Sequence, residues 1–228
     1  MEHRTWNSEL KITAVICTLN EAGSLPHVLP KIPNFVDEII LVDGHSTDGT
    51  VEVAKRLHPD VKVLYQPTKG KDNALIYGVE AATGDIVVTL DADGSTDPEE
   101  MSKFIQPLLE GYDFAKGSRF RKGKPSRMSW LHFLGNWILT IEADLLFGAR
   151  YTDLCSGYNA FWRKAWKRIE HHGGFVYEPV ITLRARKEKL KVIEIPNQDR
   201  GRVSGRSKLP TWGQGWGAFL AILKERFG

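Results

Sequence analysis

Residues 86–94 read Ile-Val-Val-Thr-Leu-Asp-Ala-Asp-Gly, an apolar, β-branched run that stops at two carboxylates. A continuous run of this kind predicts a strand that is buried on both faces, as in a parallel sheet. Similar runs occupy residues 12–18 and 38–42, and the second of them also ends in an aspartate, Asp43. Together the three runs predict a buried parallel sheet with acidic turns after two of its strands.

Helical segments separate the predicted strands. Asp97 precedes Pro98 and two glutamates, which favours the start of a helix. Strands that alternate with helices over short connections predict an α/β fold, a Rossmann-like, mostly parallel sheet flanked by helices on both faces. Right-handed crossovers place the carboxyl ends of the strands on one edge, where ligands of open α/β sheets bind. In the first half we expect strands at 12–18, 38–42, 61–65 and 86–90, and helices at 25–32, 50–57 and 72–82.

The second half of the chain is less regular. It contains a basic loop, an apolar helical segment, a second helix, one strand, a loop rich in glycine, serine and basic residues, and a tryptophan-rich tail. Because no clean linker interrupts the chain, we expect one domain over residues 1–228. In chain order these segments are 116–127, 129–147, 177–188, 191–195, 199–208 and 211–228.

The composition excludes several classes of protein. The chain has 228 residues, 42% of them hydrophobic and 26% charged, which is typical of a globular protein. Two cysteines provide no disulfide framework, and a net charge of +3 is too small to indicate nucleic-acid binding. No apolar run approaches the roughly 18–20 residues of a membrane span, and the first ten residues lack the apolar core of a signal peptide. The glycine motifs of dinucleotide-binding proteins, phosphate-loop proteins and α/β-hydrolases are also absent.

The Asp91-Ala-Asp93 turn is the first candidate site. Two carboxylates on either side of a turn can share a hard divalent cation such as Mg²⁺ or Mn²⁺, together with a substrate phosphate. Aspartate and glycine also favour turns without any ligand. The position of the pair after a buried strand, on the expected ligand edge, favours the metal site.

The turn over residues 43–50 is the second candidate. Asp43 follows a strand, where acidic residues elsewhere bind a nucleotide base or ribose. Asp48 and Thr50 are suited to capping the helix that follows. His45 is more simply explained as a solvated loop residue than as a metal ligand or a base.

Six motifs in a fixed order resemble family 2 glycosyltransferases of GT-A fold, and among them the polyprenyl-phosphate glycosyltransferases, including dolichyl-phosphate mannosyltransferase. The resemblance covers about residues 11–210. Each motif is weak or moderate alone, but their order makes the resemblance specific. The motifs are Ile-Cys-Thr-Leu-Asn20-Glu21, Val-Asp43-Gly-His-Ser-Thr-Asp48-Gly-Thr, Leu-Asp91-Ala-Asp93, Lys-Gly117-Ser-Arg119-Phe, Thr152-Asp153-Leu-Cys-Ser156-Gly157 and Arg202-x-x-Gly205-x-Ser207-Lys208.

The resemblance implies an inverting transfer of a sugar from a nucleoside-diphosphate sugar, GDP-mannose or a UDP-sugar, to a polyprenyl phosphate. Asp91 and Asp93 would hold Mg²⁺ or Mn²⁺, and Asp93, Asp153 and Arg119 would be catalytic. Residues 11–110 would form the half that binds the nucleotide sugar, 111–210 the half that binds the acceptor, and 211–228 an amphipathic tail. The residues expected to bind the substrates are Thr18, Asn20, Glu21, Asp43, Asp48, Lys71, Asp91, Ser95, Arg119, Glu178, Arg202, Ser207 and Lys208.

Charge neutralisation at the departing phosphate is the main requirement of this chemistry. Arg119, Arg202 and Lys208 are suited to binding a diphosphate or an acceptor phosphate. A phosphate acceptor needs little help from a base, since the second pKa of a phosphate monoester is about 6. A hydroxyl acceptor would need one, and Asp153 or Glu178 would be the candidate. Each of these acids is equally consistent with a structural partner of an arginine.

The apolar segment near 129–147 has two explanations. Its apolar residues recur at spacings of three and four, which predicts one broad apolar helix face. That face either packs on the core or lies in a membrane interface, where tryptophan and the preceding basic loop are favoured. We expect a cytoplasmic protein that associates peripherally with the inner face of the membrane through residues 116–147 and the tail. Transfer to a soluble hydroxyl acceptor, and a non-catalytic sugar-nucleotide-binding subunit, are the alternatives.

Overall fold

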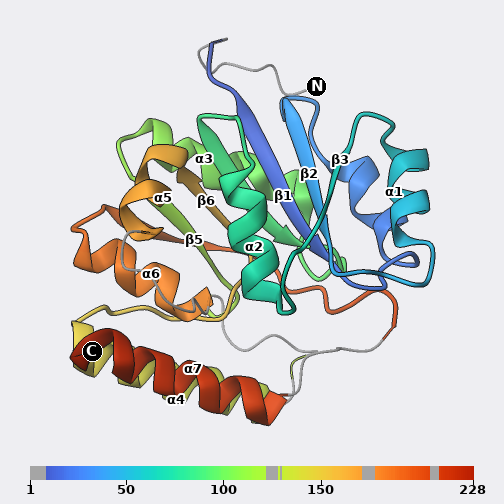
Figure 1. Ribbon diagram of the computed structural model, residues 1–228. Helices are drawn as coiled ribbons and strands as arrows, with labels where there is room; N and C mark the ends of the chain where they lie inside the picture. The colour runs from blue at the N-terminus through green and yellow to red at the C-terminus, as the bar shows by residue number, and fades with distance from the viewer. Residues whose placement is uncertain (1–8, 122–127, 129, 171–177, 206–210) are drawn as a thin grey trace.

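A seven-stranded sheet forms the centre of the molecule in the computed structural model (Figure 1). The structure describes residues 9–121, 128, 130–170, 178–205 and 211–228. The strand order is β3-β2-β1-β4-β6-β5-β7, so strands from both halves of the chain share one sheet. The strands are β1 (Ile12–Thr18), β2 (Glu38–Asp43), β3 (Lys62–Tyr65), β4 (Ile86–Asp91), β5 (Phe114–Ser118), β6 (Asn159–Trp162) and β7 (Val192–Pro196).

The four strands of the first half are parallel, as the sequence predicts. The apolar runs of β1, β2 and β4 are buried along almost their whole length. β6 is antiparallel to both β4 and β5, while β7 is parallel to β5. The mostly parallel sheet is therefore confirmed, with one antiparallel strand that the sequence analysis does not assign.

Helices cover both faces of the sheet, as expected (Figure 1). One face packs against α1 (Thr50–Leu57) and α3 (Met101–Leu109). The other face packs against α2 (Lys71–Glu80), α5 (Arg163–Glu170) and α6 (Glu178–Lys187).

The helix expected at 25–32 is wrong in detail. The segment forms two 3₁₀ turns, Leu25–His27 and Leu29–Lys31, and each turn has a proline in its first two positions. Pro30 has no backbone N–H to donate to the preceding turn, so one continuous helix would lose a hydrogen bond there. Leu25 and Leu29 still bury their side chains in the core.

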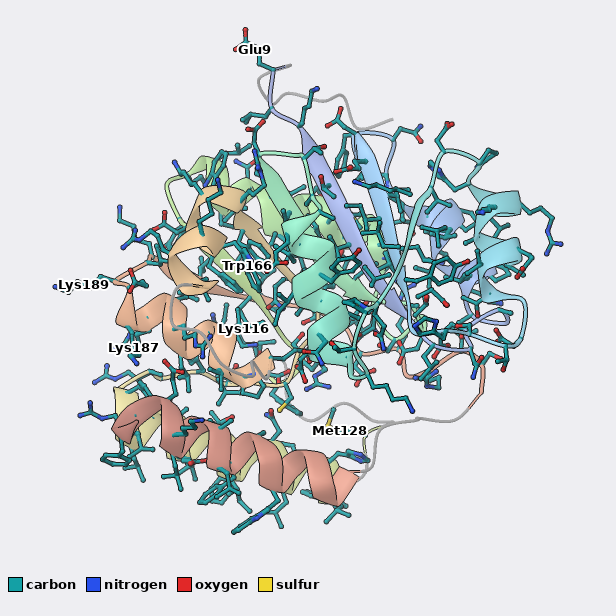
Figure 2. The ribbon with its side chains drawn as sticks, viewed as in Figure 1. Glu9, Lys116, Met128, Trp166, Lys187 and Lys189 are labelled. Atoms are coloured by element: carbon teal, nitrogen blue, oxygen red, sulfur yellow. The ribbon has the colours of Figure 1, made fainter. Side chains whose placement is uncertain are left out.

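Lys116 is not part of an exposed basic loop, which corrects the expectation for 116–127. It lies in β5, its side chain is 1% exposed, and Figure 2 labels it within the body of the molecule near α6. Burial lowers the pKa of Lys116, although the nearby carboxylates of Asp153 and Glu194 act in the opposite direction. Residues 122–127 of that loop lie outside the described residues.

A pair of helices forms a third layer below the carboxyl edge of the sheet. α4 (Trp130–Phe147) and α7 (Thr211–Phe227) lie side by side there, and α6 contacts both (Figure 1). A small core of their own, which includes Leu139, Ala143 and Ile222, joins the pair to α6. In the part of the chain that the structure describes, no helix is both long and apolar enough to cross a membrane.

Candidate active site

The register of the sheet brings the acidic strand ends together. Thr18 at the end of β1 pairs with Asp43 of β2, and the preceding Cys17 pairs with Asp91 of β4. The predicted meeting of these turns on one edge is therefore confirmed. Asp91 and Asp93 line a cavity of about 570 Å³ that lies between this edge and the α4/α7 pair.

Lys71 is the centre of a charged cluster on the cavity wall. It is the first residue of α2, and its Nζ lies 2.6 Å from Asp91 Oδ1 and 3.0 Å from Glu178 Oε1. Burial by itself would raise the pKa of Asp91, but the charge and hydrogen bond of Lys71, together with the charges of Arg119 and Arg202, outweigh burial and lower the pKa. Burial and Glu178 raise the pKa of the adjacent Asp72 to about 7. Asp91 and Glu178 thus share a single ammonium group, while Asp72 Oδ1 accepts from the Glu178 N–H at 3.1 Å.

Asp93 is the second carboxylate of the Asp91/Asp93 pair and also lines the cavity. Its Oδ1 accepts a hydrogen bond of 2.9 Å from the Ser95 N–H, and its Oδ2 lies 3.4 Å from Nη2 of Arg202. The same arginine donates through Nη1 to Glu21 Oε1 at 2.6 Å. Burial and the negative charge of Asp91 raise the pKa of Asp93 despite Arg202. The environment of Asp93 therefore favours an additional positive charge.

Arg119 and Asp153 form a buried ion pair. Arg119 donates to the Asp153 carboxylate through Nε at 2.7 Å, through Nη2 at 2.9 Å and through its backbone N–H at 3.1 Å. Burial alone would raise the pKa of Asp153, but these contacts outweigh it and lower the pKa. Arg119 lines the cavity, whereas Asp153 is fully buried behind it. The structure thus favours the structural alternative for Asp153, the partner of an arginine.

The turn that starts at Asp43 is held by its own hydrogen bonds. Asp43 is fully buried, and its oxygens accept from Ser46 N at 2.8 Å, Ser46 Oγ at 2.6 Å and Thr18 Oγ1 at 3.2 Å. Asp48 accepts from the backbone N–H groups of Ala22 and Thr50, each at 3.1 Å. Asp48 thus satisfies the first N–H of α1, as the sequence predicts.

Asn20 ties this turn to the end of β1. Asn20 Oδ1 accepts from Thr47 N at 2.7 Å, and Asn20 N donates to Ser46 Oγ at 2.8 Å. Thr18, Asn20, Asp43 and Asp48 lie at the same edge of the sheet but not on the cavity wall. Their nucleotide-binding role stays a prediction.

Several cavity residues escape the sequence analysis. Asp72 and Asp199 add two carboxylates to the wall, and Cys155, Ser156 and Gly157 form a further side. The Ser156-Gly157 motif was a usable signal for that side, whereas nothing in the sequence marks Asp72 or Asp199. Ser207 and Lys208 lie outside the described residues.

The wall opposite the sheet comes from α4, α7 and the residue Met128, which Figure 2 labels between the helix pair and the sheet. It is mostly apolar, and His132 and Asn136 of α4 are its polar side chains. Gly135 on α4 and Gly215 on α7 both line the cavity, and a Cβ added at either would meet no atom within 4 Å. The cavity therefore combines a charged floor with an open, apolar side. The apolar and small residues on that side are Met128, Leu131, Gly135, Leu139, Gly215 and Ala218.

The charge balance of the floor indicates the kind of ligand it suits. Five carboxylates face three cationic side chains, and the excess of acid suits a bound cation. Arginine presents a planar fork that matches phosphate oxygens. Among the described residues no group of three or more His, Cys, Asp or Glu side chains is placed to hold a metal ion. The acids of the floor are Asp72, Asp91, Asp93, Glu178 and Asp199, and its cations are Lys71, Arg119 and Arg202.

Comparison with known proteins identifies the family. Residues 13–170 match the model of "Glycosyl transferase family 2". The glycosyltransferase AglJ of Haloferax volcanii is 31% identical to this chain. The match covers 82% of this chain and 62% of AglJ. The dolichyl-phosphate hexose transferase of the same organism is 30% identical over 93% of this chain and 92% of its own. The polyprenol monophosphomannose synthase of Mycolicibacterium smegmatis is 29% identical over 86% of this chain and 79% of its own.

Solved structures share the fold. Glucosyl-3-phosphoglycerate synthase from Mycobacterium tuberculosis, in complex with Mn²⁺, UDP-glucose and phosphoglyceric acid, superposes with a TM-score of 0.72 at 23% identity. That match covers 96% of this chain and 80% of the other. A second complex of the same enzyme gives a TM-score of 0.70 and covers 99% of this chain and 86% of the other. The expected GT-A fold is therefore confirmed, and the chain is a glycosyltransferase that belongs to glycosyl transferase family 2.

Proposed function

We propose that the protein transfers a hexose from a nucleoside-diphosphate sugar, GDP-mannose or a UDP-sugar, to a polyprenyl phosphate. The observation that carries this proposal is the composition of the cavity. Its charged floor suits a sugar diphosphate with a cation, and its apolar side suits an isoprenoid chain. The names of two similar proteins, a dolichyl-phosphate hexose transferase and a polyprenol monophosphomannose synthase, support the same acceptor class.

Asp91 and Asp93 would hold Mg²⁺ or Mn²⁺. The raised pKa of Asp93, caused by burial and by the charge of Asp91, supports a cation at this position. Two carboxylates leave room for diphosphate oxygens in the coordination shell, as is usual for Mg²⁺. The bound ion would neutralise charge on the departing diphosphate.

The chain's own residues would bind and orient the two substrates. Arg202 already bridges Glu21 and Asp93, and its guanidinium is placed to turn toward a diphosphate. Arg119, held by Asp153, would bind the acceptor phosphate. An oxygen of that phosphate would form a bond to the sugar C1 as the bond from C1 to the nucleoside diphosphate breaks, with inversion at C1.

Asp153 would act by holding Arg119 rather than as a base. An ionised phosphate needs no proton removed, because the second pKa of a monoester is about 6. Of the two candidate bases, Asp153 and Glu178, only Glu178 lines the cavity. It would act as a base only if the acceptor were a hydroxyl group.

The α4/α7 pair would dock on a membrane. Its exposed apolar side chains recur at helical spacing on both helices, and three of them are tryptophans. Tryptophan is favoured at membrane interfaces, where amphipathic helices lie in the plane of the bilayer. Docking there would place the apolar side of the cavity near the lipid acceptor. The exposed residues are Trp130, Leu131, Leu134, Trp137, Ile138, Ile141, Leu145, Trp216, Leu220 and Phe227.

The parts of the chain would divide the work within one catalytic domain. Residues 11–110 would bind the nucleotide sugar, 111–210 the acceptor, and 211–228 would complete the membrane-facing side. All three segments line the cavity, so each could contact a substrate there, and Arg202 would extend the second segment to the donor diphosphate. We place the protein peripherally at the cytoplasmic face of the membrane.

Binding of the donor is tested by thermal protection. GDP and UDP should raise the melting temperature of the wild-type protein in the presence of Mn²⁺, and the preferred nucleotide should raise it most. Asp93→Asn should lose the Mn²⁺-dependent part of this shift because one metal ligand is weakened. Full protection and full activity of Asp93→Asn would overturn the metal assignment.

The acceptor is tested by comparing a polyprenyl phosphate with free glycan hydroxyls as substrates. We expect transfer to the phosphate alone. Gly135→Leu should reduce this transfer while leaving donor protection unchanged, because leucine would enter the apolar side of the cavity without a backbone clash. Replacing a helical glycine by leucine also favours the helix by about 0.7 kcal/mol, so the variant should fold. Transfer to glycan hydroxyls with none to polyprenyl phosphate would overturn the acceptor.

A further inference from the structure

A second cavity, of about 480 Å³, lies far from the acidic floor. It is formed where α4, α6 and α7 end, and its floor includes Leu146, Phe147 and Leu190. Figure 2 labels Lys187 and Lys189 at this end of α6, above the carboxyl-terminal end of α7. The charged residues of its wall are all basic, namely Arg186, Lys187, Lys189 and Arg226.

Backbone N–H groups and two of the basic side chains share the helix ends. Arg186 Nε donates to Phe147 O at the end of α4, and Lys187 Nζ donates to Glu225 O in the last turn of α7 at 3.0 Å. Gly148 N donates to Asp144 O at 2.8 Å, Leu190 N to Ala185 O at 2.9 Å and Gly228 N to Lys224 O at 2.8 Å. Among the described residues the Lys189 and Arg226 side chains donate to no helix carbonyl, so these two exceed what helix capping needs.

Three of the four cations have no acidic partner among the described residues. Two carboxylates close to the recess are paired elsewhere or with the fourth cation: Glu225 with Arg184 at 3.0 Å and Lys187 at 2.8 Å, and Glu188 with Arg168 at 3.5 Å. Arg186 is oriented by a hydrogen bond of 2.9 Å from its Nε to Phe147 O. Lys189 and Arg226 are exposed. This end of the molecule thus concentrates positive charge in a recess that suits an anion.

The basic recess adjoins the apolar face of the α4/α7 pair. Leu145, beside Leu146, is 80% exposed, and Phe227, beside Arg226, is 75% exposed. An apolar face with a basic rim matches the two layers of an anionic membrane, acyl chains and phosphate headgroups.

We propose that this recess, lined by Arg186, Lys189 and Arg226, binds the phosphate of an anionic phospholipid headgroup. Bound lipid would fix the rotation of the α4/α7 face on the bilayer, since the recess lies at one end of the helix pair. The proposal rests on the membrane docking proposed above, but not on the sugar-transfer reaction.

The test measures binding to phosphatidylcholine vesicles with and without phosphatidylglycerol. Wild type should bind the anionic vesicles more tightly. The variant Arg186→Gln/Lys189→Gln/Arg226→Gln should lose at least tenfold in affinity for them, because each basic residue near an anionic surface contributes about fivefold. Lys31→Gln/Lys55→Gln/Arg56→Gln removes the same charge from exposed positions in the region of α1 and should lose little. Lys189→Gln/Arg226→Gln spares the Arg186–Phe147 hydrogen bond and should show a smaller loss in the same direction.

Equal losses of vesicle affinity in the recess variant and in the α1-side control would overturn the proposal, because they would show that affinity depends only on the net charge of the protein. Thermal protection of wild type by free glycerol phosphate, lost in the recess variant, would assign the recess to a soluble phosphate and also overturn it. Transfer to a water-soluble, short-chain isoprenyl phosphate should be unchanged in every variant. Absence of that transfer in wild type would instead count against the proposed function.

Discussion

Gly157 lies directly against two carboxylates of the active site. A Cβ added there would be 2.8 Å from Asp91 Oδ2 and 3.0 Å from Glu178 Oε1. Gly157→Ala should therefore push Asp91 out of its contact with Lys71 and disturb the metal site beside it. Misplacement of a reacting group by about 1 Å can cost about 100-fold in rate, so we expect a loss of kcat of this order. Steady-state kinetics with saturating Mn²⁺ would measure it.

Gly135→Ala is the matched control for that substitution. Gly135 also lines the cavity, but a Cβ there meets nothing within 4 Å. It should retain kcat within about twofold and gain slightly in stability, as a helical alanine is favoured over glycine by about 1 kcal/mol. Equal kcat values for the two variants would show that the position of Asp91 does not limit the reaction.

The Arg119–Asp153 pair gives a prediction about stability. Asp153→Asn leaves the Arg119 charge buried without its counterion, and breaking a buried pair from one side costs about 3–5 kcal/mol. Unfolding by urea should show a loss of this size. The double variant Arg119→Gln/Asp153→Asn should recover part of it, because the Arg119 charge is removed together with its partner, and only part, because the buried Lys116 still loses the nearby Asp153 carboxylate.

Activity separates the positioning role of Asp153 from a merely structural one. Asp153→Asn should raise the KM for the acceptor more than it lowers kcat, since Arg119 would still be present but less well oriented. The pH dependence of kcat provides the contrary result. If kcat of the wild type fell at low pH with a single pKa, and Asp153→Asn lacked this fall, Asp153 would instead be a general base.

At the scale of residues, the sequence predicted the positions that topology determines. Asp91 and Asp93 follow a buried strand, so their place at the carboxyl edge follows from the parallel register. Partners from loops are different. Asp153 is 34 residues from Arg119, and only the packed loop shows that the two carboxylate oxygens meet the guanidinium. Lys116 was predicted to lie in an exposed basic loop because lysine is rarely fully buried, whereas in the structure it lies in a buried strand.

Among the elements, α4 contains a buried acid. Glu142 is buried, and neither of its carboxylate oxygens has a hydrogen-bond partner. Burial raises the pKa of Glu142 to about 7. Because the unfolded value is lower, the unfolded chain releases this proton first as the pH rises, and the free energy of unfolding falls between about pH 4.5 and pH 7.

Glu142→Gln removes this pH dependence. The variant should match wild type at about pH 5 and exceed it by about 2 kcal/mol at about pH 8, where the wild-type carboxylate is ionised. Urea unfolding at both pH values would measure the difference. Glu80→Gln, at an exposed position on α2, should show no such change between the two pH values. A constant difference for Glu142→Gln at both pH values would contradict the cause assigned to it.

The elements missed by the sequence analysis have weak local patterns. β5 reads Phe-Ala-Lys-Gly-Ser and β6 is four residues long, so neither has the apolar run that marked the first four strands. Five of the eight residues of α5 are charged, so its helix was not recognised from the sequence. Its three buried residues are Ala165, Trp166 and Ile169. These residues are spaced for one helix face, and that spacing was the usable signal.

The whole molecule consists of a sheet that fixes the acids and a helix pair that closes the cavity. The first part was predictable, because alternation of strands and helices determines the layers and the edge where ligands bind. The second was not, since the pairing of α4 with α7 depends on contacts between segments separated by more than sixty residues in the chain. Sequence periodicity showed an apolar face on α4 but left open whether it was covered.

The structure leaves that face largely exposed, which allows a prediction for the whole molecule. Trp137→Glu/Leu145→Glu places two charges on the exposed face, where Trp137 is 53% and Leu145 80% exposed. Charged side chains are costly in the apolar part of a bilayer, so binding to vesicles of any lipid composition should be lost. Transfer to polyprenyl phosphate in vesicles should fall in parallel, because the enzyme no longer reaches its acceptor.

The same variant should transfer sugar at the wild-type rate to a water-soluble isoprenyl phosphate, since neither residue lines the cavity. Lys103→Gln/Gln106→Glu makes the same change in net charge at exposed positions of α3 and should retain vesicle binding. Flotation of vesicles and the two transfer assays measure these outcomes together. Retained flotation of Trp137→Glu/Leu145→Glu would show that the protein meets membranes by another surface. Loss of both transfer activities would mean that the face stabilises the active site rather than docking it.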